Sequence, residues 1–418
     1  MEKLRNTYRL WQVKAFNYNG QSYGVDSLYG LGVGLKAIWD HQHPANCSNS
    51  TFLIGSRWVF SGFGSEVHCE GAAMGLAMSI GRIYLQHPYP YHRWQTDLDF
   101  CRAQNKKNLE CYFEPWSSCT IFDALGPQAL EILRFHNDNG QIPCLTRMSP
   151  GIGCLKARRT MIGEALKGNF SMFLRAAGHE KTVLLRNIGA LWHGFVPPQF
   201  INIVKCSPFK KTFYYYWWRA LSASYILRPN GKTLKWLEDN SLYRNLSSDN
   251  PPVIGVYVRR GQKSSEMRLL PFSEYINATE FLWKGFPEFL KPDKLWTKSV
   301  FFATEDPGVL HEAILWASAS QVNLLYTDLF ERNGTAAASA NGEGTHHGLE
   351  YLSMLLNIDH LLQSSAWVCT LASNFCRLVD ELRTTVSPLL TRPFVDISPE
   401  TCNLSPCVGD GVFDLQWR

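Results

Sequence analysis

The sequence of 418 residues has no long apolar run. No stretch of about 20 consecutive apolar residues occurs, and residues 1–20 are polar, without the hydrophobic region of a signal peptide. We therefore expect no membrane anchor within this chain. Charged residues are few, at 18%, and the net charge is only +5. Because nucleic-acid-binding domains usually have a strongly basic face, this balance favours a small anionic ligand and no nucleic acid.

Metal-binding patterns are also missing or incomplete. No C-x-x-C pair is present, which makes a structural zinc site unexpected. His311-Glu312 begins an H-E-x-x-H pattern, but Leu315 occupies the place of the second histidine. Asp97 and Asp99 form a D-x-D pair, a common pattern that binds a metal–diphosphate in some glycosyltransferases, and nothing else in the sequence resembles a metal site. We expect no metal cofactor.

Cysteines and glycosylation motifs, in contrast, are plentiful. The chain has 12 cysteines and seven N-x-S/T motifs, where chance gives roughly three; the motifs begin at Asn46, Asn49, Asn169, Asn245, Asn277, Asn333 and Asn403. Both features indicate an oxidising secretory lumen, such as the Golgi. Aromatic residues make up 13% of the chain, which fits large cores and aromatic-lined carbohydrate clefts.

One stretch in the second half combines a buried strand with a cluster of charges. Residues 253–258 are an apolar, partly β-branched run, and Arg259, Arg260, Lys263 and Glu266 follow it. The run predicts a fully buried parallel strand, and ligands of open α/β sheets bind beyond the carboxyl ends of such strands. Arginine suits phosphate oxygens because its guanidinium is a rigid fork of donors. The alternative is a solvated loop after a strand.

The surrounding sequence predicts an α/β protein. After residue 253, strands are expected at 299–304, 322–326 and 366–370, and helices at 271–283, at 349–362 and from Ser373 onward. This alternation predicts a doubly wound parallel sheet. The first half has an expected strand at 52–60, a glycine turn, a helix of small residues and a strand at 81–85; residues 160–230 are expected to be mostly helical. The aromatic run 213–220 is expected to form a helix wedged between two domains.

Several separated segments then resemble one family, the α-1,6-fucosyltransferases. The segments that carry the resemblance are Gly62-Phe-Gly64 with His68, Glu114-Pro-Trp-Ser-Ser-Cys119, Trp217-Trp-Arg-Ala220 with Arg228-Pro229, residues 253–266, Ala303-Thr-Glu-Asp-Pro307, and residues 368–377. They occur in the family's order, between about residues 45 and 400.

The resemblance implies a GT-B-like fold of two domains. The N-terminal, acceptor-side α/β domain would span 1–230, a Rossmann-like domain for the donor GDP-fucose would span 251–400, and 401–418 would be a tail. The implied reaction moves L-fucose, with inversion and without a metal, to a GlcNAc-containing glycan, by an α-1,6 linkage to the core GlcNAc of N-glycans. The resemblance also implies disulfides Cys369–Cys376 and Cys47–Cys119. The family's SH3-like domain, coiled coil and membrane anchor have no counterpart in this sequence.

Site residues are carried over position by position. Arg259 matches the essential diphosphate arginine, with Arg260 beside it; Lys263 matches a lysine near the diphosphate, and Glu266 matches the proposed catalytic base. The remaining donor-binding positions are Tyr257, Asp306, Asn357, Asp359, Ser373, Gly62 and Gly64. An ion pair between Glu266 and Lys263 or Arg268 is the alternative role for Glu266.

Some positions depart from the family pattern. Tyr257 replaces a histidine, Gln262 replaces an acid, and one residue is missing between Lys263 and Glu266. The family's guanine-reading aspartate falls on Asn357, with Asp359 two residues on. Two other functions therefore stay open. One is a fucosyltransferase for a chitin-type oligosaccharide or a protein hydroxyl, and the other is a catalytically silent nucleotide- or glycan-binding relative.

Overall fold

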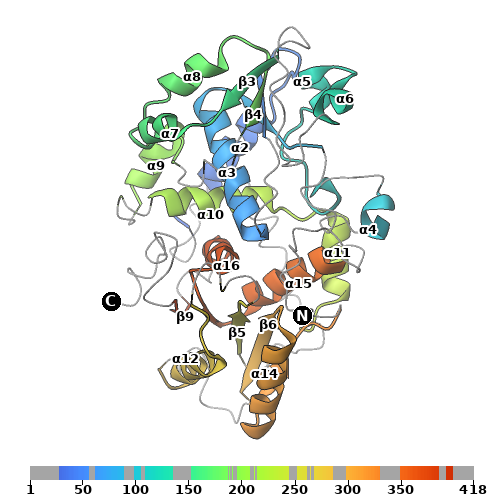
Figure 1. Cartoon of the computed structure of the whole chain (residues 1–418), viewed down its shortest axis with the longest axis vertical. Helices are drawn as coiled ribbons and strands as arrows, with labels where there is room; N and C mark the ends of the chain where they lie inside the picture. Colours follow the sequence, from blue (N-terminus) through green and yellow to red (C-terminus); the bar gives the residue numbers. More distant parts are fainter. Residues whose placement is uncertain are drawn as a thin grey trace.

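The structure is a computed structural model of the whole chain (Figure 1). It describes residues 28–55, 62–88, 98–104, 109–134, 152–186, 195–207, 214–243, 252–260, 268–285, 298–329, 349–385 and 392–398, with the single residues 188, 191, 211 and 264. Two parallel sheets organise these residues. The expected α/β class is confirmed.

A four-stranded parallel sheet forms the core of the first half. Its strand order is β2-β1-β4-β3. The elements of this half are α2 (Leu31–Gln42), β1 (Phe52–Gly55), α3 (Phe63–Ser79), β2 (Ile83–Leu85), α4 (Leu98–Arg102), η3 (Leu109–Cys111), α5 (Ile121–Leu125), α6 (Ala129–Arg134), β3 (Ile152–Lys156), α7 (Arg159–Leu166), α8 (Ser171–Ala177), β4 (Thr182–Arg186), η5 (Pro198–Phe200), α9 (Ile201–Lys205), α10 (Tyr214–Ile226) and α11 (Gly231–Asp239).

The strand β4 corrects one expectation. Residues 160–230 were expected to be mostly helical, but Thr182–Arg186 pairs in parallel with both β1 and β3. The run Thr-Val-Leu-Leu is almost completely buried. A short, fully buried apolar run has no period that separates a strand from a helix, so its sheet neighbours decide its conformation.

A five-stranded parallel sheet forms the core of the second half. Its order is β7-β6-β5-β8-β9, the doubly wound Rossmann-like arrangement that the sequence predicted. Its elements are β5 (Val253–Val258), α12 (Phe272–Gly285), β6 (Ser299–Thr304), α14 (Pro307–Ala319), β7 (Asn323–Leu325), α15 (Leu349–Gln363), β8 (Ala366–Cys369), α16 (Asn374–Thr384) and β9 (Phe394–Asp396). The central strands β5, β6 and β8 are buried, as the continuous apolar runs predicted.

Helices α10 and α16 lie between the two sheets (Figure 1). The aromatic helix α10 packs against α2, α3 and α16, so the expected wedge is present. Trp217 and Trp218 are fully buried in it. Their indole N–H groups donate to the carbonyls of Tyr29 and Gly71, at 2.7 and 3.2 Å. The two halves therefore share one continuous core.

Buried charges join α3, α10 and α16. Glu381 of α16 is fully buried, and its carboxylate lies 2.5 Å from Nη2 of Arg219 in α10 and 2.8 Å from Nε2 of His68 in α3. Burial, with a smaller effect from Arg219, lowers the pKa of His68 to about 4, so the imidazole is neutral near pH 7. Next to it, Tyr216 donates to Asp380 at 2.9 Å. Each contact ties α16 to a helix of the other half.

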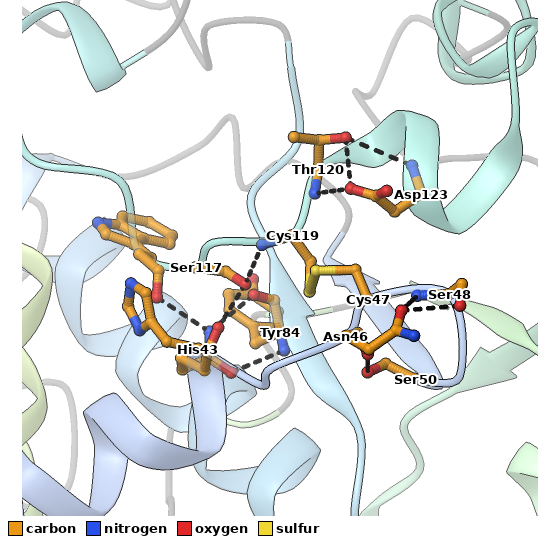
Figure 2. Close-up of a disulfide and its surroundings, with 12 residues drawn as sticks. His43, Asn46, Cys47, Ser48, Ser50, Tyr84, Ser117, Cys119, Thr120 and Asp123 are labelled. Atoms are coloured by element: carbon orange, nitrogen blue, oxygen red, sulfur yellow. Dashed lines mark hydrogen bonds between the residues drawn. A yellow bond between two sulfur atoms is a disulfide. The ribbon is translucent and has the colours of Figure 1, made fainter.

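Disulfides close loops in both halves. Cys47 is bonded to Cys119 (Figure 2), and Cys369 is bonded to Cys376, as the family resemblance implied. A third bond joins Cys101 to Cys111. In the part of the chain that the structure describes, Cys69 and Cys206 are free.

The close approach of α3 to α16 predicts contrasting effects at two glycines. A Cβ on Gly64 would lie 2.4 Å from the carbonyl oxygen of Asn374, whereas a Cβ on Gly62 meets nothing within 4 Å. Gly62 has a φ of −77°, which alanine adopts readily. Gly64→Ala should therefore lower the free energy of unfolding by about 1–3 kcal/mol. Gly62→Ala should change it by less than about 0.5 kcal/mol. Urea titration of both variants measures this, and equal stabilities would contradict the contact.

The burial of His360 in α15 should make the free energy of unfolding depend on pH. Its Nδ1 donates to the Leu356 carbonyl at 2.6 Å, and its Nε2 accepts the Leu242 N–H at 2.9 Å, so the ring is neutral. Burial lowers its pKa from 6.5 to about 4. The unfolded chain takes up the proton first on acidification, so the stability that His360 contributes is complete above pH 6.5 and is lost towards pH 4. The loss is about 3 kcal/mol.

Urea titrations between pH 4 and 7 measure this loss. His360→Gln should flatten the profile by the share that His360 contributes, whereas the exposed control His311→Gln should keep the wild-type profile. An unchanged slope in His360→Gln would show that this histidine does not titrate on unfolding.

Candidate active site

The five-stranded sheet has one topological switch point. From β5 the chain adds β6 and β7 on one side, and β8 and β9 lie on the other side. Val256 of β5 pairs with Val368 of β8, so the carboxyl ends of the two strands are neighbours. In open α/β sheets, ligands bind in the crevice beyond such a point. The residues that follow β5 and β8 are therefore the candidate site.

Arg259 follows β5 and is held by an acid from the next strand. Its Nη1 donates to the carboxylate of Glu305, which follows β6, and to the carbonyl of Arg260 at 2.9 Å. The same glutamate oxygen accepts the backbone N–H of Arg260 at 2.6 Å. The side chains of Arg259 and Glu305 are 16% and 10% exposed. Because it is partly desolvated and fixed in place, the guanidinium is preorganised.

Tyr257 of β5 contacts α16 across the switch point. Its ring stacks on Phe375 of α16, with centroids 4.4 Å apart. Burial, with a smaller effect from the carboxylate of Glu305, raises the pKa of Tyr257 well above its usual value, so the phenol stays neutral. The aromatic contact spans the switch point between β5 and the helix that follows β8.

The turn between β8 and α16 is held by Asp396, the last residue of β9, and by Ser398 just beyond it. The Asp396 carboxylate accepts the Leu371 N–H at 3.0 Å and the Ser398 hydroxyl at 2.6 Å. Ser398 in turn accepts the Ala372 N–H at 3.0 Å. The Cys369–Cys376 disulfide closes the same turn covalently. These bonds fix the start of α16, where its unpaired N–H groups give a positive end to the helix.

Ser373 occupies the N-cap position of α16. Its hydroxyl makes no capping hydrogen bond to the helix, and the residue is 2% exposed. Arg377 donates from Nε to the Leu371 carbonyl at 2.5 Å, which brings a second cation to this turn. A carboxylate or phosphate at the switch point would therefore meet Arg259 from β5 and the positive end of α16 from β8.

Gly62 and Gly64 both lie at the start of α3 but differ in role. Asn374 donates to the Ser65 hydroxyl at 2.9 Å, so the first turns of α3 and α16 touch. Gly64 permits that contact. Gly62 has open space where a side chain would be. Gly62 is thus the glycine at which a ligand could approach the backbone, and donor binding by either glycine stays a prediction.

Asp306 and the two α15 residues have defined partners. The Asp306 carboxylate accepts the N–H groups of Gly308 and Val309, at 2.8 and 3.2 Å, and so caps α14. Asn357 accepts the hydroxyl of Thr327, which follows β7, at 2.9 Å. Asp359 accepts from Gln363 at 2.7 Å. Residues two apart on a helix point to different faces, and Asn357 contacts a residue that follows a strand end.

Other predicted site residues lie outside the described part of the chain. They are Lys263, Glu266 and Gln262, together with Asp97 of the D-x-D pair. Among the residues that the structure describes, no group of three or more His, Cys, Asp or Glu could hold a metal ion. No helix within those same residues is long and apolar enough to cross a bilayer.

Sequence reasoning missed three residues that build the site. Glu305 was noted only within the segment 303–307 that carries the family resemblance, and Asp396 and Ser398 were not singled out. One signal was available for Glu305, because it is an acid directly after a buried strand that neighbours the strand of Arg259. For Asp396 and Ser398 no signal was available, because β9 was not among the expected strands.

Comparison with solved structures finds fucosyltransferases at low identity. The Arabidopsis thaliana FUT1 mutant in complex with GDP aligns with a TM-score of 0.46 and 13% identity, covering 91% of this chain and 77% of that one. The fucosyltransferase NodZ from Bradyrhizobium aligns with a TM-score of 0.40 and 14% identity, covering 79% and 93%.

Comparison of sequences is more specific. The Drosophila melanogaster α-(1,6)-fucosyltransferase is 27% identical over 173 residues, which are 41% of this chain and 26% of that protein. The chain thus spans about a quarter of that relative's length. The family model for α-(1,6)-fucosyltransferase N- and catalytic domains matches residues 211–396, which contain α10, the switch point and α16. Residues 211–396 belong to the α-1,6-fucosyltransferase-like family.

Proposed function

We propose that the protein transfers L-fucose from GDP-β-L-fucose to a GlcNAc-containing glycan, forming an α-1,6 linkage to the core GlcNAc of N-glycans. One observation carries the proposal: Arg259 and the positive end of α16 flank the switch point of a doubly wound sheet. The family match of residues 211–396 supports the reaction and the donor. The acceptor rests on the family resemblance.

The diphosphate of the donor would lie between Arg259 and the start of α16. As the bond from fucose C1 to the diphosphate oxygen breaks, negative charge grows on that oxygen. Arg259 is already fixed by Glu305, and α16 by Asp396 and the disulfide, so little reorganisation is needed. Lys263 would add a third positive charge. With this charge supplied by the protein, we propose that GDP departs without a divalent cation.

Glu266 would act as the base. The acceptor hydroxyl oxygen forms the new bond to C1 from the face opposite the diphosphate, and its proton passes to the Glu266 carboxylate. The electron pair of the broken bond leaves with GDP, so the β-linked donor gives an α-linked product.

Asn357 is the better candidate for the guanine. It lies on the face of α15 that contacts the residues following β7, whereas Asp359 is buried and bonded to Gln363. An amide offers one acceptor and two donors where a carboxylate only accepts. The substitution at this position is also the observation that favours the second candidate function, a nucleotide-binding relative that does not catalyse transfer.

We also propose that the protein resides in the secretory lumen. The Cys47–Cys119 bond lies beside two N-x-S/T motifs (Figure 2), and Asn46, Asn49, Asn169 and Asn277 are all exposed among the described motif asparagines. The Oδ1 atoms of Asn46 and Asn169 accept the N–H groups of Ser48 and Ser171, at 2.8 and 3.1 Å. Digestion with an amidase in ¹⁸O water, read by peptide mass spectrometry, should label Asn46 or Asn169. Unmodified motifs with reduced cysteines would contradict a lumenal location.

Three variants test the proposed roles. Arg259→Ala should weaken GDP binding and lower transfer by roughly 100- to 1000-fold, because it removes a preorganised charge. Arg259→Lys should not restore the rate, because an ammonium lacks the planar fork. Glu266→Gln should leave GDP affinity nearly unchanged while turnover falls steeply. The exposed Glu312→Gln is the matched control and should change neither quantity.

Calorimetric GDP affinity and mass-spectrometric initial rates, with GDP-fucose, a biantennary N-glycan and EDTA, give these values. Near-normal turnover of Glu266→Gln would reassign Glu266 to an ion pair. GDP binding without transfer to any acceptor would favour the non-catalytic relative. A rate that needs Mn²⁺ would return Asp97 and Asp99 to consideration as ligands.

A further inference from the structure

Charge is divided unevenly between parts of this chain. Residues 152–211 contain ten lysines and arginines against two glutamates, a net charge of +8, although the whole chain carries only +5. Residues 251–398 contain twelve cationic and sixteen acidic residues, a net charge of −4. A local excess of this size indicates a surface that meets a negatively charged partner.

Three of these cations gather at one end of the four-stranded sheet. Lys156 is the last residue of β3, Arg158 is the N-cap residue of α7, and Arg159 is its first residue. All three are exposed. We call Lys156, Arg158 and Arg159 the cationic edge. Arg186 at the end of β4 pairs in register with Lys156 and adds a fourth cation beside it.

The cationic edge is electrostatically unfavourable in the protein alone. No salt bridge joins its three side chains to a carboxylate of the described residues. The helix α7 has no acid in its first turn, and arginines there oppose the positive end of the helix dipole. The acid of that helix, Glu164, instead bonds Lys167 at 2.9 Å. An anion from outside the chain would relieve this repulsion.

The cationic edge lies at the carboxyl-end border of the first sheet, the border from which the chain continues to α3. Lys156 pairs in register with Arg186, and Leu185 pairs with Gly55, so the carboxyl ends of β3, β4 and β1 form one border. From β1 to β3 are two strand spacings, about 10 Å. After β1 comes α3, whose first turn touches the start of α16. An oligosaccharide of a few units, with its reacting hydroxyl at the donor, can therefore extend along this border.

We propose that Lys156, Arg158 and Arg159 bind a carboxylate or sulfate group of an acidic glycan acceptor. The inference rests on the proposed transfer to a glycan and adds the charge class of that glycan. Guanidinium groups make paired hydrogen bonds to a carboxylate or sulfate, which an uncharged sugar does not offer. The cationic edge would thus select among acceptors, and the chemistry at Arg259 would be unaffected by it.

Calorimetry with matched glycans tests the proposal. With GDP present, a sialylated biantennary N-glycan, its desialylated form and a sulfated form are titrated into the wild-type protein at low and high salt. We expect the two acidic glycans to bind about tenfold more tightly than the neutral one, with the difference lost at high salt. Binding of only one acidic form identifies that group as the ligand.

Two triple variants locate the effect. Lys156→Gln, Arg158→Gln and Arg159→Gln together should reduce the affinity for acidic glycans to that for the neutral glycan and leave GDP affinity unchanged. The control combines Lys232→Gln, Lys235→Gln and Lys284→Gln, which removes the same charge from exposed positions on α11 and α12 and should keep the preference.

Other results would overturn the proposal for the cationic edge. Acidic glycans that bind no more tightly than the neutral one, including no binding at all, overturn the proposal, as does an equal loss in the control. A glutamate-rich peptide that binds more tightly than either acidic glycan overturns it in favour of a polypeptide partner. Transfer measured in parallel separates the two claims: fucosylation of both glycans at equal rates rejects only the cationic edge, whereas no transfer to any glycan rejects the proposed function.

Discussion

The arrangement of the two halves depends on one buried charge, the carboxylate of Glu381. It is fully buried on α16 and faces Arg219 of α10 and the neutral imidazole of His68 of α3. A buried charge that loses its partner typically costs about 3–5 kcal/mol. Because its partners all come from the first half, α16 can sit in only one register against α3 and α10. The start of α16, eight residues earlier, is placed by the same contact.

The position of α16 determines where positive charge gathers in the site. The start of α16 lies beyond β8 and Arg259 lies beyond β5, and these strands are neighbours at the point where the sheet reverses its order. Both sources of positive charge are held by carboxylates from neighbouring strand ends, Glu305 for the arginine and Asp396 for the helix turn. The first half contributes the close contact at Gly64 and, on the same border of its sheet, the cationic edge. Donor chemistry and acceptor selection would thus be separate functions of the carboxyl ends of the two sheets.

Much of the second half could be predicted from sequence because its central strands are unambiguous. Residues 253–258 and 299–304 are continuous apolar runs with charges directly after them, and both form buried strands at those bounds. The first half was harder, since the short run at β4 takes its conformation from its neighbours. The Cys47–Cys119 and Cys369–Cys376 pairs followed from family resemblance, because spacing alone does not define pairing. The Cys101–Cys111 bond was not predicted. The role of Glu305 depends on the register of β5 and β6, and the choice between Asn357 and Asp359 depends on how α15 is rotated. Neither quantity is contained in local sequence.

Hydrogen exchange with and without GDP can locate the nucleotide at the switch point, because it maps the contact onto the backbone without requiring turnover. We expect slower exchange at residues 257–260, 304–306 and 370–377 when GDP binds, with little change at residues 152–160 of the first half. Protection confined to the first half, or no protection at 257–260 and 370–377 despite measurable GDP binding, would contradict a nucleotide site at the switch point.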